Sequence, residues 1–366
     1  MNKQDWTYKK LGEVAEVFAG QGAPQGDSNY SLDGTPFVKA GNLSDLINGE
    51  SESSIQKVSK EVAQSHKLKL YKAGSVLFAK SGMSCMKGFV YTLKSDCYVV
   101  SHLAIITPHS VNSHFLNYYL RYNKPNSLIK DEAYPSISLK DIENLQIPSP
   151  PIAEQERIVA ELDLLSGIIE KKKEQLKAYD QLAQSIFYTM FGDPIDNPKG
   201  WETKKLGQVY KLKSGDGLSA KQFIEGQYPV YGGNGISGYH NSYNMDGDYI
   251  IIGRVGAYCG NVRYVSGKFW LTDNAFQLIY DEKEQHPVFI KHLLTVLDLH
   301  QYANHAAQPV ISNITLKEVK VLFPPLSLQQ EFAEKVEAIE RQKALVQQSI
   351  EETQTMFDCT MDKYFG

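Results

Sequence analysis

Several polar side chains of this 366-residue chain stand just after strand-like runs, where a sheet edge could present them to a ligand. Lys80 follows the run 76–79 and precedes Ser81-Gly82, and Arg254 follows 250–253 and precedes Val255-Gly256. Arginine can donate two hydrogen bonds to guanine, and asparagine or glutamine can pair in the same way with adenine. Binding of a phosphate is an equally reasonable role for such a cation. The residues predicted to contact nucleic acid are Lys80, Ser81, Lys87, His102, Tyr134, Asn234, Arg254, Asn261, Arg263, Asn274 and Gln308. For each one alone, a solvated surface or turn-stabilising role is the competing interpretation.

A catalytic role finds little support in the sequence. Phe18-Ala-Gly20-Gln-Gly22 matches the F-x-G-x-G pattern of adenine methyltransferases, but the chain has no Asn/Asp-Pro-Pro-Tyr/Phe motif to accompany it. The corresponding place later in the chain has only Ser214-Gly-Asp-Gly217, which favours a shared turn. No phosphate-binding G-x-x-x-x-G-K-[ST] loop and no G-x-S-x-G elbow occurs. Glu170-Lys-Lys172 resembles part of a nuclease motif, but it lies within a long predicted helix. We therefore predict a protein without catalytic residues and without a metal site.

The composition is that of a globular protein, with 42% hydrophobic and 22% charged residues. The net charge of −4 does not by itself indicate a nucleic-acid partner. Acidic residues, however, concentrate in 152–192 and 326–366, which leaves the remainder neutral to mildly basic. The start lacks an apolar signal segment and no run could span a bilayer, so a cytoplasmic protein without membrane contact is expected. The four cysteines show no metal or disulfide spacing and are expected to be small apolar fillers.

The chain repeats itself. Trp6-Thr-Tyr-Lys-Lys-Leu-Gly-Glu-Val14 returns as Trp201-Glu-Thr-Lys-Lys-Leu-Gly-Gln-Val209, and Pro135-Ser-Ile-Ser138 returns as Pro309-Val-Ile-Ser312. Pro-Pro pairs at 150–151 and 324–325 are each followed by a glutamine, and Phe-Gly ends both copies. The framework is duplicated, whereas the stretches 21–38 and 214–238 barely agree. Such a pattern suits a protein that reads two different targets with one scaffold, and a drifted structural duplication is the alternative.

Each Pro-Pro pair introduces about 40 residues with no proline, a predicted helix of about 60 Å. Apolar positions in both helices recur at alternating steps of four and three, the period that buries one helix against a partner helix. Tandem copies make an antiparallel pair the simplest arrangement, with a pseudo-two-fold axis and one globular domain at each end. The helix pair would then set the distance between the domains, and a helical hairpin packed on its own domain is the alternative. The seam is predicted at Ile158, Leu162, Leu165, Ile169, Leu176, Phe332, Val336, Ile339, Val346 and Ile350, with polar members such as Lys172 and Lys343.

The globular parts alternate strand-like runs and turns with single helices, which is typical of an α+β domain. In the second copy we expect a strand at 248–253, strand-like runs at 258–264 and 269–276, a glycine-rich loop at 231–238 and a helix at 287–299. In the first copy the expected strands are 74–78, 88–93 and 98–106, with a helix near 113–122.

Taken in order, these motifs resemble the specificity subunit of Type I restriction-modification systems. The resemblance rests on the W-x-x-K-K-L-G-x-V openings, the G-x-G turns, the P-x-I-S segments and the Pro-Pro-x-x-x-Gln helix entries. Phe191-Gly-Asp-Pro194, Tyr228-Pro-Val-Tyr-Gly-Gly-Asn-Gly235 and Thr272-Asp-Asn-Ala-Phe276 add to it. It covers nearly the whole chain and divides it into two target-recognition domains, 1–151 and 193–325, and two spacer helices, 152–192 and 326–366.

The resemblance implies a non-catalytic subunit that reads a split double-stranded DNA site, with one half-site for each domain. Two modification subunits would dock along the helices and supply S-adenosylmethionine and adenine methylation. Restriction subunits would add ATP- and Mg-dependent translocation and cleavage, so this chain would hold no cofactor of its own. The competing hypothesis is a non-catalytic coiled-coil interaction protein with globular ends.

Overall fold

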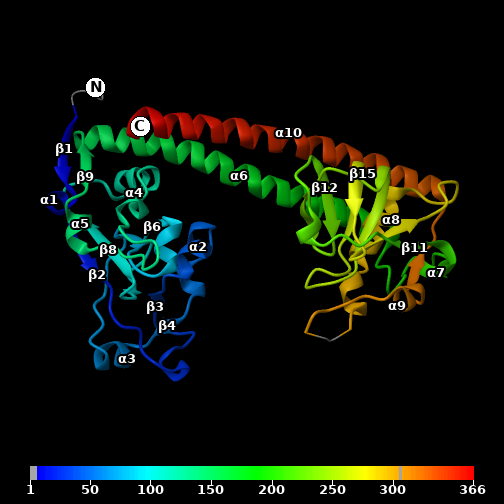
Figure 1. Cartoon of the computed structure of the whole chain (residues 1–366), viewed down its shortest axis with the longest axis horizontal. Helices are drawn as coiled ribbons and strands as arrows, with labels where there is room; N and C mark the ends of the chain where they lie inside the picture. Colours follow the sequence, from blue (N-terminus) through cyan, green and yellow to red (C-terminus); the bar gives the residue numbers. More distant parts are fainter. Residues whose placement is uncertain (1–5, 305–306) are drawn as a thin grey trace. The chain divides into compact units, whose positions relative to one another are not determined.

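The computed structural model describes residues 6–304 and 307–366, and they form two compact units (Figure 1). The first unit holds the chain up to Lys171 together with Ile350–Gly366, and the second holds Lys172–Ser349. Each unit therefore contains one copy of the repeat and part of each long helix. We call the globular parts copy 1 and copy 2.

The two copies have the same strand order. Copy 1 contains an antiparallel sheet β2-β8-β5-β6, and copy 2 contains the matching order β11-β16-β14-β15. In copy 1 the strands are β2 (Ala15–Ala19), β5 (Val76–Ala79), β6 (Val90–Thr92) and β8 (Leu103–Pro108). In copy 2 they are β11 (Lys211–Ser214), β14 (Met245–Gly253), β15 (Val262–Leu271) and β16 (Ala275–Ile279). The repeat seen in the sequence is thus a repeat of one fold.

A second group of strands is separate from the main sheet in copy 1 but continuous with it in copy 2. In copy 1, β3 (Thr35–Val38) pairs in parallel with the short β7 (Tyr98–Val99) and antiparallel with β4 (Lys57–Val58). In copy 2, β12 (Tyr228–Gly232) pairs in parallel with the end of β15 and antiparallel with β13 (Gly235–His240). Because β15 is unbroken, copy 2 has one six-stranded sheet where copy 1 has two smaller ones.

The remaining elements also occur in pairs. Strand β1 (Thr7–Lys10) pairs with β9 (Gln146–Ser149), as β10 (Thr203–Lys205) pairs with β17 (Lys320–Leu322). The matched short helices are α1 (Leu11–Val14) with α7 (Leu206–Val209), α4 (Ser113–Tyr122) with α8 (Pro287–Val296), and α5 (Leu139–Glu143) with α9 (Asn313–Lys317). Helices α2 (Asn42–Ile47) and α3 (Lys60–Ser65) occur in copy 1 alone among the described residues.

The long helices are α6 (Ile152–Phe191) and α10 (Leu326–Phe365), and both begin directly after a Pro-Pro pair as predicted. Gly192 follows α6 at φ +79, the left-handed conformation in which glycine commonly ends a helix. Every predicted seam position is buried or half-buried. The fold class is therefore confirmed as two tandem α+β copies with a long antiparallel helix pair.

Contacts within each unit establish the antiparallel direction. In the first unit, the Tyr364 hydroxyl donates to Glu161 (2.7 Å) and accepts from Arg157 (3.1 Å). In the second unit, Lys172 Nζ donates to the Ser349 carbonyl (3.1 Å), and Lys343 Nζ lies 2.7 Å from Asp180 Oδ1. From Arg157 to Asp180 along α6, the contacted residues of α10 run backwards from Tyr364 to Lys343, so the two helices are antiparallel.

Phenylalanines anchor the last turn of each long helix in a globular core. Phe191 of α6 contacts Phe289 of α8, with ring centroids 4.8 Å apart, and Phe365 of α10 contacts Phe115 of α4 at 5.4 Å. These four residues form two equivalent pairs in the repeat. Each copy thus receives the end of one long helix into its apolar core.

The strand and helix predictions need four corrections. The predicted strand 98–106 is two strands, β7 and β8, because Leu103 N–H donates back to Val100 O (3.0 Å) in a turn. The predicted loop 231–238 is a tight hairpin between β12 and β13, with Gly235 at φ +102. The predicted runs 258–264 and 269–276 overlap the single strand β15, which follows a turn at 258–261. Helix α8 stops at Val296, because Asp298 adopts φ +44.

One cysteine also departs from expectation. Cys85, Cys97 and Cys259 are buried, as predicted for small apolar fillers, but Cys359 is exposed. It lies between the seam positions Phe357 and Thr360, on the outer face of α10. In the described part of the chain, no helix combines the length and the apolar character needed to cross a membrane.

Buried glutamines tie each long helix to its own copy. Gln329 is fully buried, donates to Pro324 O (2.8 Å) and accepts from the backbone N–H of His286 (2.9 Å), at the start of α8. Gln155 does the same with Pro150 O and the Asn112 N–H, both at 2.8 Å. The glutamine after each Pro-Pro pair is therefore a buried bridge between the long helix and the α4 or α8 helix.

We predict that Gln329→Ala lowers the free energy of unfolding by about 1–3 kcal/mol, because it strands a buried N–H and a buried carbonyl. Gln330, exposed on the same helix turn, is the control, and Gln330→Ala should change stability by less than about 0.5 kcal/mol. Urea unfolding followed by circular dichroism measures both. Equal effects of the two substitutions would contradict the bridging role.

Candidate nucleic-acid interface

The two cations singled out in the sequence occupy the same backbone position in the two copies. Lys80 N–H donates to His102 O (2.9 Å), and Lys80 O accepts from Ile137 N–H (2.8 Å). Arg254 N–H donates to Asn274 O (2.8 Å), and Arg254 O accepts from Ile311 N–H (2.9 Å). Each cation is thus fixed between the residue that precedes β8 or β16 and the P-x-I-S segment.

The same framework brings together two more predicted residues from each copy. An isolated antiparallel bridge joins Ser81 to Ser136, and its counterpart joins Val255 to Val310. Tyr134 and Gln308 each lie two residues before the bridged residue of the P-x-I-S segment, and both are exposed. The structure therefore gives each copy three matched positions: Lys80, His102 and Tyr134 in copy 1, and Arg254, Asn274 and Gln308 in copy 2. We call these the matched positions.

In copy 2 the predicted residues line a hollow. Asn234, Asn274 and Gln308 face a pocket of about 430 Å³ whose wall includes the β12–β13 hairpin. Arg263 of β15 lies beside the hairpin turn, with Nη2 3.4 Å from Asn234 O. Amide and guanidinium groups on a concave surface offer the donors and acceptors that recognition of base edges requires.

The Arg254 side chain is held in place but keeps hydrogen-bonding capacity. Its guanidinium carbon is 5.3 Å from the centre of the Phe276 ring, and Nη1 is 3.4 Å from Asp273 O. Nε is buried without a hydrogen-bond partner among the described residues. The buried Nε is out of reach of a ligand from outside, but a guanidinium has five N–H donors, and the contact with Asp273 O leaves others on this half-buried side chain for a polar ligand.

In copy 1 the matched positions carry different chemistry. Ser81 Oγ is 2.9 Å from His102 Nδ1, and both side chains reach the surface. Burial raises the pKa of the Cys85 thiol, while the nearby Lys80 charge acts in the opposite direction. Lys87 lies apart at the end of a short turn, with its ammonium 5.8 Å from the centre of the Phe89 ring. The two copies thus share the backbone frame, but the side chains at the matched positions differ.

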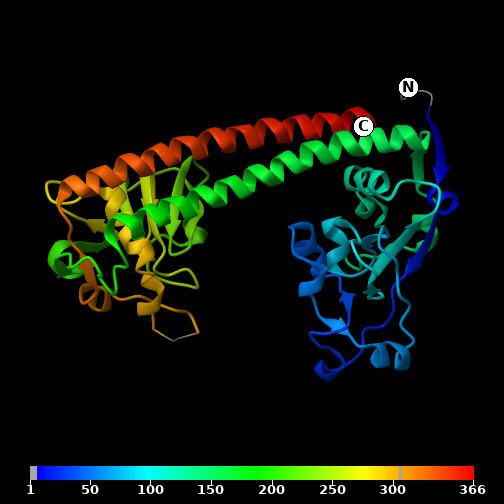
Figure 2. The same cartoon turned by 180° about the vertical axis from the view of Figure 1, so that it is seen from behind.

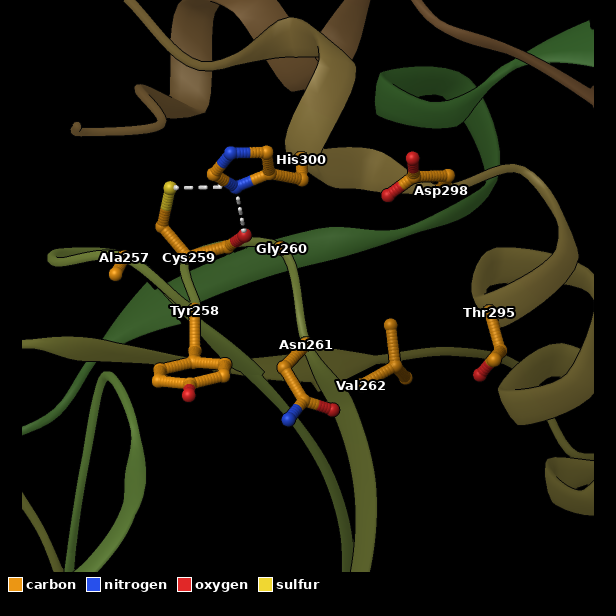
Figure 3. A pocket seen from close by; sticks show the side chains of 9 residues that line it. All are labelled: Ala257, Tyr258, Cys259, Gly260, Asn261, Val262, Thr295, Asp298 and His300. Atoms are coloured by element: carbon orange, nitrogen blue, oxygen red, sulfur yellow. Dashed lines mark hydrogen bonds between the residues drawn. The ribbon is translucent and has the colours of Figure 1, made fainter. Parts of the chain in front are cut away.

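Asn261 does not join this group. It lines a separate hollow of about 350 Å³ with Cys259, His300 and Asp298 (Figure 3). His300 Nδ1 is 2.9 Å from Cys259 O and 3.4 Å from the thiol sulfur. A carbonyl only accepts, so Nδ1 must carry the proton and cannot take one from the thiol.

The pair therefore lacks the features of a nucleophile and its base. Burial raises the pKa of the Cys259 thiol, whereas a reactive cysteine needs a lowered pKa. Copy 1 has a cysteine at the equivalent turn, Cys85, and both turns are closed by the same backbone bond. Among the described residues, no three histidine, cysteine or acidic side chains gather as a metal would require.

The central residue of each G-x-G segment has a role that was not predicted from the sequence. In copy 1, Gln21 makes two side-chain hydrogen bonds to the backbone of residues 67 and 69. In copy 2, Asp216 Oδ2 accepts from Asn244 Nδ2 (2.9 Å), at the corresponding entry to the sheet. We call Gln21 and Asp216 the clamp residues, because their side chains hold a neighbouring segment of the chain. The sequence signal for them is that the middle residue differs between the two motifs while the glycines are shared.

The first glycine of each G-x-G segment marks a close backbone crossing. A Cβ at Gly20 would lie 2.1 Å from Val100 O, and one at Gly215 would lie 2.3 Å from Leu271 O. A Cβ at the second glycine, Gly22 or Gly217, meets nothing within 4 Å. Chain crossing thus explains the first glycine of each segment, whereas the prediction of a shared turn is wrong, because neither 20–22 nor 215–217 forms a turn.

Comparison with known proteins gives the family. A model of the Type I restriction modification DNA specificity domain matches residues 3–178 and again 198–354. The chain belongs to this family and carries its domain twice.

Individual relatives agree with this assignment. The chain is 29% identical over 214 residues to the Type I restriction enzyme EcoprrI specificity subunit of Escherichia coli, a match that covers 54% of this chain and 53% of that protein. It is 23% identical over 239 residues to the MjaIX specificity subunit of Methanocaldococcus jannaschii, covering 60% and 55%. The matches span about half the length of these relatives.

Solved structures share the fold. The S subunit of a Type I restriction-modification system from M. genitalium aligns over 99% of this chain and 96% of its own, with a TM-score of 0.59 and 16% identity. A chain from a study of Type I complex assembly aligns over 98% and 97%, with a TM-score of 0.58 and 18% identity.

We predict that Gly215→Ala lowers the free energy of unfolding by about 1–3 kcal/mol, because the added methyl group collides with a backbone carbonyl. Gly217→Ala is the control and should change stability by less than about 0.5 kcal/mol. Thermal unfolding of the two variants and the parent measures this. If Gly217→Ala proved the more damaging change, the crossing would not explain the motif.

Proposed function

We propose that this chain is the DNA-specificity subunit of a Type I restriction-modification complex and that each copy reads one half of a split site. The observation that carries this proposal is the set of matched positions, where one backbone frame presents Lys80, His102 and Tyr134 in copy 1 but Arg254, Asn274 and Gln308 in copy 2. A duplicated fold that drifted would also keep a main-chain frame, but it would have no reason to keep a side chain able to hydrogen-bond at all six matched positions. Family membership supports the same conclusion.

We further propose the division of labour in the complex. Residues 1–151 and 193–325 act as the recognition domains, and 152–192 and 326–366 act as spacer helices. Modification subunits bind the helices and supply S-adenosylmethionine-dependent adenine methylation, and restriction subunits supply ATP- and Mg-dependent cleavage. This chain supplies no catalytic group, and it works in the cytoplasm, where cellular DNA is found. Support for a non-catalytic role comes from Cys259 and His300, which are arranged unlike a catalytic pair.

The direct test uses the chain assembled with its modification subunits. Sequencing of methylated adenines in a host that expresses the complex should reveal one bipartite motif. A gel-shift assay with that duplex should show preference over a scrambled duplex. Absence of any sequence preference in both experiments would favour the coiled-coil interaction protein.

We predict that Arg254→Ala relaxes recognition at one half-site only, with a loss of about 1–3 kcal/mol for the base it contacts. Lys80→Ala is the matched variant, and it should affect the other half-site. Competition gel shifts with duplexes altered in one half at a time separate the two. A response of both halves, or of neither, to either variant would contradict the assignment of one copy to one half-site.

We also predict that one heptad added to both α6 and α10, near Lys172 and Ser349, lengthens the spacer of the recognised site and keeps both half-sequences. A heptad preserves the 3.5-residue seam and adds about 10 Å of helix. Methylome sequencing of the host measures the spacer. Adding a heptad to α6 alone is the control and should abolish methylation, because it breaks the seam register. An unchanged spacer with both insertions would contradict the proposed role of the helices.

A further inference from the structure

Copy 1 carries a basic segment that the matched positions do not include. Residues 56–70 contain four lysines and a single acidic residue, Glu61. Lys60, Lys67 and Lys69 are exposed, and none of them forms an ion pair within the described part of the chain. We call these three residues the lysine ridge. With Glu61 as the one acidic neighbour, it is a net positive surface in a protein whose net charge is negative.

The clamp residue of the first G-x-G segment holds the ridge in place. Gln21 Nε2 donates to Lys67 O (2.8 Å), and Gln21 Oε1 accepts from the backbone N–H of Lys69. The Lys69 ammonium lies 3.6 Å from the centre of the Phe18 ring, which restrains the side chain without neutralising its charge. Two of the three cations are therefore positioned by the motif that the two copies share.

The sheet register places the ridge beside the matched positions. Ala19, two residues before Gln21, pairs with Ala104, and Ala79, next to Lys80, pairs with Leu103. The G-x-G segment, Lys80 and His102 thus share one end of the sheet. Helix α3, which carries Lys60, lies at the end of copy 1 away from α6 and α10 in both views (Figures 1 and 2).

Lys67 occupies a position where glycine is the usual residue. Lys67 N–H donates to Gln64 O (3.1 Å), and Leu68 N–H donates to Ala63 O (2.8 Å), which closes α3 in the Schellman pattern. Lys67 takes the left-handed conformation that this pattern requires, with φ +52. A lysine there is conformationally unfavourable, so its presence points to a role for the side chain.

Copy 2 has no counterpart to the ridge among its described residues. Asp216 replaces Gln21 as the clamp, and the segment it holds, 241–248, contains two aspartates and no lysine. Copy 2 has other exposed lysines, such as Lys211 and Lys213 of β11, but among the described residues only copy 1 has lysines on the segment that its G-x-G residue holds.

We propose that the lysine ridge binds the phosphate backbone of the DNA next to the half-site read by copy 1, and that copy 2 has no clamped equivalent of the ridge. This rests on the proposed function and adds to it an electrostatic asymmetry between the two half-sites. Phosphate contacts supply affinity and register without sequence information, so the ridge would bind duplexes of any sequence.

The test uses the full chain and a labelled random-sequence duplex of about 30 base pairs, titrated at several salt concentrations. The variant is Lys67→Gly combined with Lys69→Gln. We expect it to bind several-fold more weakly at low salt, and the slope of log affinity against log salt to become shallower by about 0.9 for each phosphate that the variant no longer neutralises. Lys67→Gly alone should leave the melting temperature unchanged or raise it, which separates weaker binding from impaired folding.

Lys9→Gln with Lys10→Gln is the matched control, because these exposed lysines lie on β1, beside the start of α6 and far from α3 (Figure 1). It should keep the parent's affinity and salt slope.

An unchanged affinity and slope in the ridge variant would overturn the inference, and so would equal losses in the control. The inference would also fail if the ridge variant bound duplex normally but no longer bound the modification subunits, since the ridge would then face an acidic protein. Sequence preference, measured separately on the assembled complex, tests the proposed function, so failure of one is distinguishable from failure of the other.

Discussion

The structure depends on how the ends of the two long helices are fixed. Each helix begins at a Pro-Pro pair whose carbonyl is bound by a buried glutamine, and each ends with a phenylalanine inside an apolar core. The helix that leaves one copy is therefore held at both ends by buried contacts. A seam of apolar residues alone would allow the helices to slide by a heptad at modest cost. The fixed ends remove that freedom, as the proposed role of the helices as spacers requires.

The backbone frame of the recognition surface is built to tolerate change. Lys80 and Arg254 are held by main-chain hydrogen bonds, which do not depend on the identity of the side chain. The first glycines of the G-x-G segments are constrained by chain crossing, whereas the residues between the glycines differ and clamp different partners. On the proposed function, specificity can therefore change without loss of the fold, because the main-chain bonds that hold the frame do not involve the side chains proposed to face the DNA.

Much of this architecture was predictable because it arises from periodic or duplicated signals. The starts of the long helices were predicted to the residue and their ends to within one residue, since proline fixes the starts and the 3.5-residue pattern runs to the closing glycines. The matched positions Lys80 and Arg254 emerged from the repeat. The break between β7 and β8 was missed, because apolar residues flank it on both sides and the polar pair Ser101-His102 was not interpreted as the turn that separates the two strands. The separation of Asn261 from the other candidates was also missed, since sequence distance does not tell which side of a turn a residue faces.

The fold separates the acidic residues of the chain from the lysine ridge. Acidic residues lie along the long helices, while the basic ridge lies on copy 1, away from them. Long-range attraction to a polyanion is weak for a chain of net charge −4, so binding must rely on local contacts at short range. Short-range contacts depend on position, which favours cations whose backbone is clamped, such as Lys69, Lys80 and Arg254. On the proposed function, a broad basic surface would bind any duplex tightly and mask discrimination, whereas a few fixed cations beside the variable side chains of the matched positions would keep non-specific affinity low enough for sequence to matter.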